Sequence, residues 1–241
     1  MDFELSDEQR LLRDTIRSFV DEQIRPVARE MESGGQYPDE IVATMRKMGL
    51  FGLLVPEEYG GLAADMVSLA VVFEEISRGW MGVAGIIGSH SLSCAMIAQF
   101  GTEEQKQAHL PALASGERRT GIALTEPGAG SDLQGIATSA RRDGDRYVIN
   151  GRKTWITNAR HADPLPVLVK TDPGAKPAHA GMSVLLYATT VSLLLALALR
   201  FTIGLTRIRY GADRGLRQKR PVRTERSVPS VADPAGPGAA R

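Results

Sequence analysis

The sequence has very little cysteine and no histidine pattern that would hold a metal. Cys94 is the only cysteine among 241 residues, which excludes an internal disulfide and is typical of a reducing compartment. The four histidines lack metal-ligand spacing, so no zinc site is expected. The first residues are acidic and continue into a charged segment, so no secretory signal is expected and the predicted location is cytoplasmic.

Most of the chain lacks an excess of positive charge, whereas the segment near its end is strongly basic. Residues 200–241 contain nine Arg and one Lys against three acids, a balance of +7, so the other residues sum to −6. This basic segment has neither interleaved aromatic residues nor a recognisable nucleic-acid-binding module, and no nucleic-acid partner is expected. After about residue 206, Arg, Pro, Gly and Ala follow no period, which predicts disorder.

Helical patterns dominate the first 116 residues. Ser6 and Gln9 form a capping box, and apolar residues then recur at helical spacing, which predicts a helix over 7–31 with a kink at Pro26. Thr102 and Gln105 form a second capping box. The segment 83–99 carries no charge and is expected to be mostly buried. Helices are also predicted over about 38–49, 65–78, 83–99 and 102–116.

Short strand-like runs replace the helical pattern after residue 116. Asp143-Gly144 and Asn150-Gly151 supply turns between these runs. The runs do not alternate with helices, so a parallel dinucleotide-binding sheet is not expected. The predicted fold class is α+β, with an all-helical N-terminal domain and a partial antiparallel, β-barrel-like middle domain. Strands are predicted over 122–125, 137–141, 147–150, 165–170 and 183–187.

The uncharged stretch 182–199 allows two interpretations. Its 18 residues reach the length of a membrane-spanning helix, and the Arg residues that follow would favour a cytoplasmic C-terminus. However, Thr189, Thr190 and Ser192 weaken this interpretation, and the stretch begins where a β-strand is expected. We therefore favour a strand at its start over membrane insertion.

The stretch TEPGAGSD at 125–132 also has alternative interpretations. A dinucleotide fingerprint would need glycine where Leu133 stands, and a Walker loop would need Gly-Lys-Ser/Thr, so neither is expected. A plain glycine-rich turn is the simplest alternative. Backbone N–H groups in such a loop can also form an anion-binding concavity, to which Ser131 would add a hydroxyl donor, while Thr125 could bind a ligand edge.

A second stretch, GRKTWITN at 151–158, is expected to be a strand that carries Trp155. An indole is a flat apolar surface that can pack against a planar heteroaromatic ring. Ordinary core packing of the same side chain is the alternative.

Together these two stretches carry a resemblance to a known family. LTEPGAGSDLQG at 124–135, followed by YVINGRKTWITNARHAD at 147–163, resembles the acyl-CoA dehydrogenase family of flavoenzymes. Helical segments such as LFGLLVPEEYGG at 50–61 resemble that family's N-terminal domain and occur in the same order. The resemblance covers about residues 3–186.

The resemblance implies a fold and a reaction. Family members have a helical domain, a β-domain and a C-terminal four-helix domain, and they bind FAD between the last two. They are usually homotetramers. A glutamate removes the α-proton of an acyl-CoA while the β-hydride passes to flavin N5, and the electrons go to an electron-transferring flavoprotein.

The resemblance also implies roles for individual residues. Ser131 would contact the cofactor phosphates and the neighbouring acyl-CoA thioester. Trp155 would lie against the isoalloxazine ring, and Thr157 would hydrogen-bond near N5, the atom that receives the hydride. The aromatic residue often found at the position of Ile122 is missing. The predicted cofactor-binding residues are Ile122, Leu124, Thr125, Gly130, Ser131, Trp155 and Thr157.

Beyond about residue 186 the resemblance is expected to end. The implied catalytic glutamate belongs to the C-terminal helical domain, which we expect to be missing, so no catalytic residue is predicted. Glu126 is rejected as a substitute because it lies in the cofactor loop. We expect either an inactive dehydrogenase or a non-catalytic module that associates with an intact paralogue, with a tail translated out of frame. The predicted divisions are 1–118, the helical domain; 119–187, a partial β-domain; and 188–241, an unrelated tail.

Overall fold

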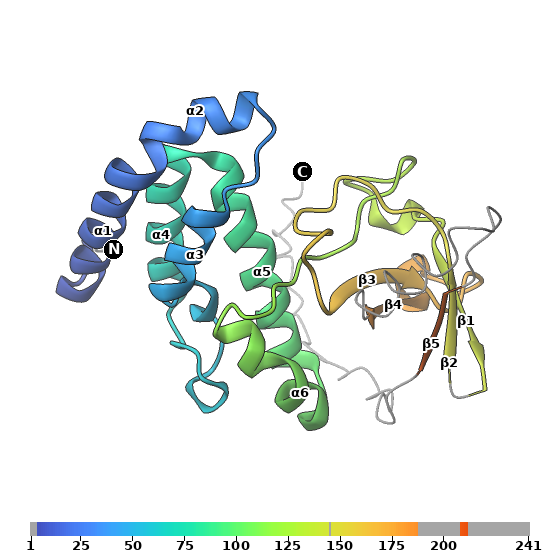
Figure 1. Ribbon diagram of the computed structural model, residues 1–241. Coiled ribbons are helices and arrows are strands. Elements are labelled where there is room, and N and C mark those ends of the chain that lie inside the picture. Colours follow the sequence, from blue (N-terminus) through green and yellow to red (C-terminus); the bar gives the residue numbers. More distant parts are fainter. Residues whose placement is uncertain (1–3, 145, 188–207, 212–241) are drawn as a thin grey trace, which may run out of the picture.

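The computed structural model describes residues 4–144, 146–187 and 208–211. Figure 1 shows the helices gathered on one side of the molecule and the strands on the other, with α5 between them. The helices are α1 (Asp7–Phe19), α2 (Arg25–Ser33), α3 (Asp39–Lys47), α4 (Met66–Gly79), α5 (Met81–Phe100) and α6 (Glu103–Ala114), with short 3-10 turns at Leu50–Gly52, Glu57–Tyr59, Leu133–Gly135 and Ala178–Gly181.

Both predicted capping boxes are confirmed. The Ser6 hydroxyl accepts a hydrogen bond from the Gln9 backbone N–H, and the Gln9 side chain accepts one from the Ser6 backbone. Thr102 and Gln105 do the same at the start of α6. These caps satisfy N–H groups that have no partner within the helix, so short local motifs mark the two helix starts.

The helix predicted over 7–31 is interrupted earlier than Pro26. A five-residue π-helical turn, Val20–Ile24, separates α1 from α2, and Pro26 lies at the start of α2. Val20 and Ile24 are both fully buried. They pack against Gly79 at the end of α4, where an added Cβ would lie 2.6 Å from the Val20 side chain. The extra residue of the π turn therefore lets both side chains face α4.

The core of the helical domain lies between α1, α3, α4 and the start of α5. It includes one buried carboxylate, Glu75, which is held by Arg17 and Arg78. The Arg17 hydrogen bond is the largest influence on the pKa of Glu75, which stays below its ordinary value despite burial. The side chains buried most completely in this core include Ile16, Val20, Ile24, Met45, Phe51, Leu53, Ile76 and Ile87.

Among the described residues, five strands form one sheet in the order β4-β3-β1-β2-β5. Three of the four neighbouring pairs are antiparallel, and β1 pairs with β3 in parallel, through Ser139 and Lys170. The α+β fold class is confirmed, but the sheet is mixed and not wholly antiparallel. The strands are β1 (Ser139–Asp143), β2 (Arg146–Asn150), β3 (Leu165–Lys170), β4 (Met182–Tyr187) and β5 (Ile208–Gly211).

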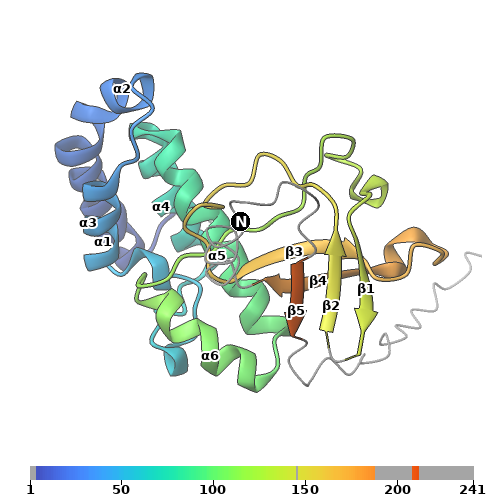
Figure 2. The ribbon, with the colours of Figure 1, turned by 45° about the vertical axis from the view of Figure 1, so that its right-hand side comes forward.

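Two segments predicted as strands have other structures. The run 122–125 forms only a parallel bridge, in which Ala123 donates to the Pro166 carbonyl at 2.8 Å and accepts from the Leu168 N–H at 3.0 Å. The segment 151–158 is a loop, because Trp155 and Asn158 both have positive φ. Figure 2 shows the chain after β2 leaving the sheet and running toward α5.

The end of the described chain also departs from the prediction. No regular element was expected after about residue 206, yet 208–211 forms β5, which pairs with the edge of β2. This pairing depends on a strand that is distant in the sequence, so local composition did not reveal it. The rest of the predicted tail lies outside the described residues.

The membrane interpretation of 182–199 can be followed only in part. Residues 182–187 form β4, and the remainder lies outside the described residues. Within the part of the chain that is described, α5 alone is long and apolar enough to cross a membrane. Half of that stretch is buried by other parts of the protein, including His90 and Cys94, as expected for the core helix predicted over 83–99.

Candidate functional site

The stretch TEPGAGSD folds as a closed turn. Glu126 and Ala129 exchange both backbone hydrogen bonds, at 2.9 and 3.2 Å, and so bring the two ends of Pro127-Gly128 together. Gly128 and Gly130 are exposed, and a Cβ added at either would meet nothing within 4 Å. Ser131, which follows, is exposed as well. The turn therefore presents an open stretch of backbone and one hydroxyl to its surroundings.

The side chain of Glu126 anchors this turn to Ala137, Thr138 and Lys153. One carboxylate oxygen accepts from the Ala137 N–H at 2.6 Å, and the other accepts from the Thr138 N–H at 3.0 Å and from Lys153 Nζ at 2.9 Å. Burial alone would raise the pKa of Glu126, but its hydrogen bonds to Thr138, Lys153 and Ala137 outweigh burial and lower the pKa to about 2. The side chain is a fixed carboxylate.

Lys153 and Thr154 connect the second predicted stretch to the first. Lys153 Nζ donates to the Leu124 carbonyl at 2.8 Å in addition to Glu126, and the Thr154 N–H donates to the Thr125 carbonyl at 3.0 Å. The two stretches, about 25 residues apart in the sequence, thus lie side by side. Sequence reasoning paired them by resemblance but did not identify the ion pair that joins them.

Trp155 projects from the loop that follows. Its side chain is 88% exposed, which contradicts the alternative of core packing. Its φ of 57° is unusual for a bulky side chain and indicates that neighbouring contacts impose this conformation. Thr157 is also exposed, and its methyl carbon lies near α5, 3.9 Å from the position of a Cβ on Gly85.

Asn158 closes the loop and was not identified from the sequence as a site residue. Its side-chain amide donates to the Ile86 carbonyl at 2.9 Å, the Thr120 carbonyl at 3.0 Å and Ser89 Oγ at 3.2 Å. Its φ of 64° lies in the left-handed region, which asparagine tolerates better than most residues. The available sequence signal was an asparagine, a residue type that tolerates a left-handed backbone, at the end of the stretch 151–158.

The predicted residues fall into two groups. Ile122, Leu124 and Thr125 are partly buried beside the bridge to β3, whereas Gly130, Ser131, Trp155 and Thr157 are exposed. Thr125 meets the Trp155 loop through its carbonyl. In the described part of the chain, no hydrogen bond or ion pair joins Ser131 to the Trp155 loop.

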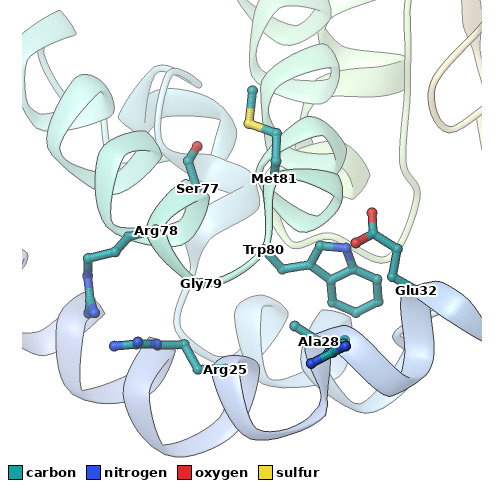
Figure 3. Close-up of a pocket in the computed structure, with 9 residues that line it drawn as sticks. Arg25, Ala28, Glu32, Ser77, Arg78, Gly79, Trp80 and Met81 are labelled. Carbon is teal, nitrogen blue, oxygen red and sulfur yellow. The ribbon is translucent and has the colours of Figure 1, made fainter.

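A separate cleft of about 440 Å³ lies in the helical domain, between α2 and the junction of α4 and α5. Figure 3 shows Arg25 and Arg78 pointing toward each other across it. Both guanidinium groups bind Asp21, at 3.2 and 2.8 Å, and Arg78 also binds Glu75. Much of their charge is therefore neutralised within the protein. Among the described residues, no group of three His, Cys, Asp or Glu side chains could hold a metal ion.

Two sequence profiles match this chain. The profile named acyl-CoA dehydrogenase, N-terminal domain, matches residues 6–117, and the profile named acyl-CoA dehydrogenase, middle domain, matches residues 121–210. The chain belongs to the acyl-CoA dehydrogenase family. Both stretches, 125–132 and 151–158, fall in the middle-domain match, which runs beyond residue 186, where the resemblance was expected to end.

Relatives support the same family. The chain is 44% identical over 169 residues to the 3-(aryl)acrylate reductase of Clostridium sporogenes, covering 69% of this chain and 45% of that protein. It is 42% identical over 173 residues to a probable acyl-CoA dehydrogenase of Bacillus subtilis, covering 71% and 45%. The chain therefore spans less than half the length of these two relatives.

Solved structures agree with the fold. The acyl-CoA dehydrogenase of Geobacillus kaustophilus is 42% identical with a TM-score of 0.71, covering 78% of this chain and 50% of that one. An acyl-CoA dehydrogenase from Bacillus anthracis complexed with FAD is 36% identical with a TM-score of 0.66, covering 77% and 31%. A chain in a structure of the electron transferring flavoprotein of Acidaminococcus fermentans is 33% identical with a TM-score of 0.72, covering 78% and 49%.

Proposed function

We propose that this chain forms the flavin-binding and thioester-binding half of an acyl-CoA dehydrogenase. The reaction is the α,β-dehydrogenation of an acyl-CoA thioester to the trans-2-enoyl-CoA, in fatty acid or branched-chain acyl-CoA catabolism. The observation that carries the proposal is the junction of two loops: the glycine turn at 126–131 and the loop of the exposed Trp155, joined through Lys153 and Thr154.

The residues at this junction fit FAD. The indole of Trp155 is exposed, and its backbone has a constrained conformation. It therefore offers a flat apolar surface against which a planar ring system can pack. The open backbone at Gly128 and Gly130, beside the Ser131 hydroxyl, suits phosphate oxygens. The structure of the Bacillus anthracis acyl-CoA dehydrogenase complexed with FAD covers 77% of this chain, which supports the same cofactor here.

Each predicted residue has a role in this proposal. Ile122, Leu124 and Thr125 line the flavin ring, Gly130 and Ser131 hold the phosphates, and Ser131 also contacts the thioester. Trp155 would pack against the ring, and the Thr157 hydroxyl would donate a hydrogen bond to it. FAD, when bound, would supply the two-electron acceptor for the dehydrogenation.

Glu126 does not act as the base in this proposal. Its carboxylate oxygens are occupied by Ala137, Thr138 and Lys153, and its pKa of about 2 makes it a very weak proton acceptor at neutral pH. We therefore propose that the described residues bind cofactor and thioester but do not remove the α-proton. On this basis the chain by itself would not turn over acyl-CoA.

The proposal extends to partners. An electron-transferring flavoprotein would accept the electrons of a complete dehydrogenase, and a homotetramer would be its assembly. The likeness to a chain in the Acidaminococcus fermentans structure supports the first of these.

Flavin titration of the purified chain tests the proposal. FAD fluorescence should be quenched saturably, and FAD should bind more tightly than riboflavin because riboflavin lacks the phosphates that Gly130 and Ser131 hold. An assay with acyl-CoA and an artificial electron acceptor should give no enoyl-CoA. Absence of binding by either flavin would refute the cofactor role. Formation of enoyl-CoA would refute the proposal that no described residue removes the α-proton.

A further inference from the structure

Asn158 connects the loop of Trp155 to two other parts of the protein. Its amide nitrogen reaches one acceptor in the connection between the domains, the Thr120 carbonyl, and two in α5, the Ile86 carbonyl and Ser89 Oγ. Ser89 in turn donates to the Gly85 carbonyl at 3.0 Å, which leaves its oxygen free to accept from Asn158. Asn158 is only 8% exposed, so these hydrogen bonds form away from competing water.

The backbone on either side of Asn158 is closely packed and hydrogen-bonded. Gly121 packs so closely on the loop that an added Cβ would lie 2.3 Å from the Thr157 carbonyl oxygen. Ser93 of α5 holds the Gly121 carbonyl at 2.7 Å, so the surface beneath the loop is itself fixed to α5. The Asn158 carbonyl accepts from the His161 N–H at 2.8 Å, which closes the turn that follows.

The Trp155 loop is therefore anchored at both ends, and Ile156 between them packs against the core of the β-domain. At its start Lys153 and Thr154 are bound to Leu124 and Thr125, and at its end Asn158 is bound to α5. Trp155 and Thr157, the two exposed residues that we propose to contact the flavin, lie between these anchors. A loop constrained in this way loses less conformational entropy when a ligand binds.

We propose that Asn158 is the positioning residue of the flavin site, which holds Trp155 and Thr157 in place through its side-chain amide and its left-handed backbone. This inference rests on the proposed function, because it assumes that the ligand is a flavin. Asparagine meets both requirements. Glycine would keep the backbone conformation but lose the hydrogen bonds of the amide, whose two hydrogens are shared among three acceptors. Aspartate would place a carboxylate against two carbonyl oxygens.

The test uses the two tryptophans of the chain. In a Trp80→Phe background, Trp155 is the only indole, and time-resolved fluorescence anisotropy reports its local motion without any flavin. Asn158→Gly should increase the fast component of that motion and weaken FAD binding about tenfold, the effect of losing one or two buried hydrogen bonds. Asn158→Asp should act in the same direction. Asn150→Asp, a change of the same chemistry at an exposed position, should alter neither quantity.

A second variant covers the case in which Asn158→Gly does not fold. Ser89→Ala removes one of the three acceptors and should give a smaller loosening of Trp155, with FAD affinity reduced about twofold. Unchanged anisotropy and unchanged FAD affinity in these variants would overturn the proposal. If the unmodified chain bound no flavin, the proposed function would fail, while the anisotropy measurement would still decide whether Asn158 orders the loop.

Discussion

Lys153 and Glu126 form an almost fully buried ion pair, 2.9 Å from Nζ to Oε1, that holds the turn at 126–131 and the loop of Trp155 together. Each partner makes further hydrogen bonds, Lys153 to the Leu124 carbonyl and Glu126 to the Ala137 and Thr138 N–H groups. Burying two charges is favourable only when both are satisfied in this way. The pair therefore organises the site, and removing one partner should damage it.

Replacement of Lys153 by methionine should destabilise the protein. Lys153→Met keeps the aliphatic side chain but leaves Glu126 as a buried carboxylate without a cation, which costs about 3 kcal/mol. Urea unfolding followed by circular dichroism measures the change. Lys47→Met, at an exposed lysine on α3, is the control and should change stability by less than about 0.5 kcal/mol. Equal stability of the two variants would contradict the role of the pair.

The stability supplied by Glu126 should depend on pH. Its pKa is lowered from an ordinary 4.5 to about 2, so the folded state favours the carboxylate. This contribution is present above about pH 4.5 and is lost as the pH falls toward 2, amounting to about 3 kcal/mol. The difference in unfolding free energy between the unmodified chain and Glu126→Gln should therefore shrink over that interval. A difference that stays constant from pH 5 to pH 2 would rule out the depressed pKa.

His90 should act in a different pH interval. Burial lowers its pKa to about 4, and the Thr120 N–H donates to its Nδ1 at 3.2 Å, so the neutral ring carries its proton on Nε2, which faces the Phe51 carbonyl. The unfolded state binds a proton below about pH 6.5, so stability is lost as the pH falls from 6.5 to 4, by up to about 3 kcal/mol. His90→Gln should lose this dependence, whereas His179→Gln, at an exposed site, should keep it.

Gly121 should not tolerate a side chain. A Cβ at this position would lie 2.3 Å from the Thr157 carbonyl oxygen, so Gly121→Ala should displace the loop and lower the unfolding free energy by about 1–3 kcal/mol. Gly128→Ala is the matched control, since a Cβ there meets nothing within 4 Å. Thermal unfolding of both variants gives the comparison, and an unaffected Gly121→Ala protein would mean that the loop is not held against the connection.

Local signals predicted the helical domain well. The capping boxes at Ser6 and Thr102 predicted two helix starts, because a cap depends on residues only three positions apart. The break between α1 and α2 was assigned to Pro26, although it lies in the π turn at Val20–Ile24. The position of that turn depends on the packing of Val20 and Ile24 against Gly79, which is distant in the sequence.

In the β-domain, the features that the sequence did not predict depend on long-range contacts. The segment 151–158 was expected to be a strand, but contacts of Asn158 with α5 and of Thr154 with Thr125 impose a loop. The strand β5 depends on the edge of β2, and the role of Glu126 depends on Lys153. Each of these features needs a partner more than 25 residues away, which periodicity and composition do not reveal.

The proposed flavin site depends most on the exposed indole of Trp155. The most direct measurement is an FAD titration of the unmodified chain beside Trp155→Ala and the control Trp80→Phe. Because Trp155 is exposed, its replacement should leave the unfolding free energy nearly unchanged while FAD affinity falls about tenfold, the loss expected for one ring-stacking contact. Trp80→Phe should bind FAD as the unmodified chain does. Equal FAD affinity in Trp155→Ala and the unmodified chain would contradict the claim.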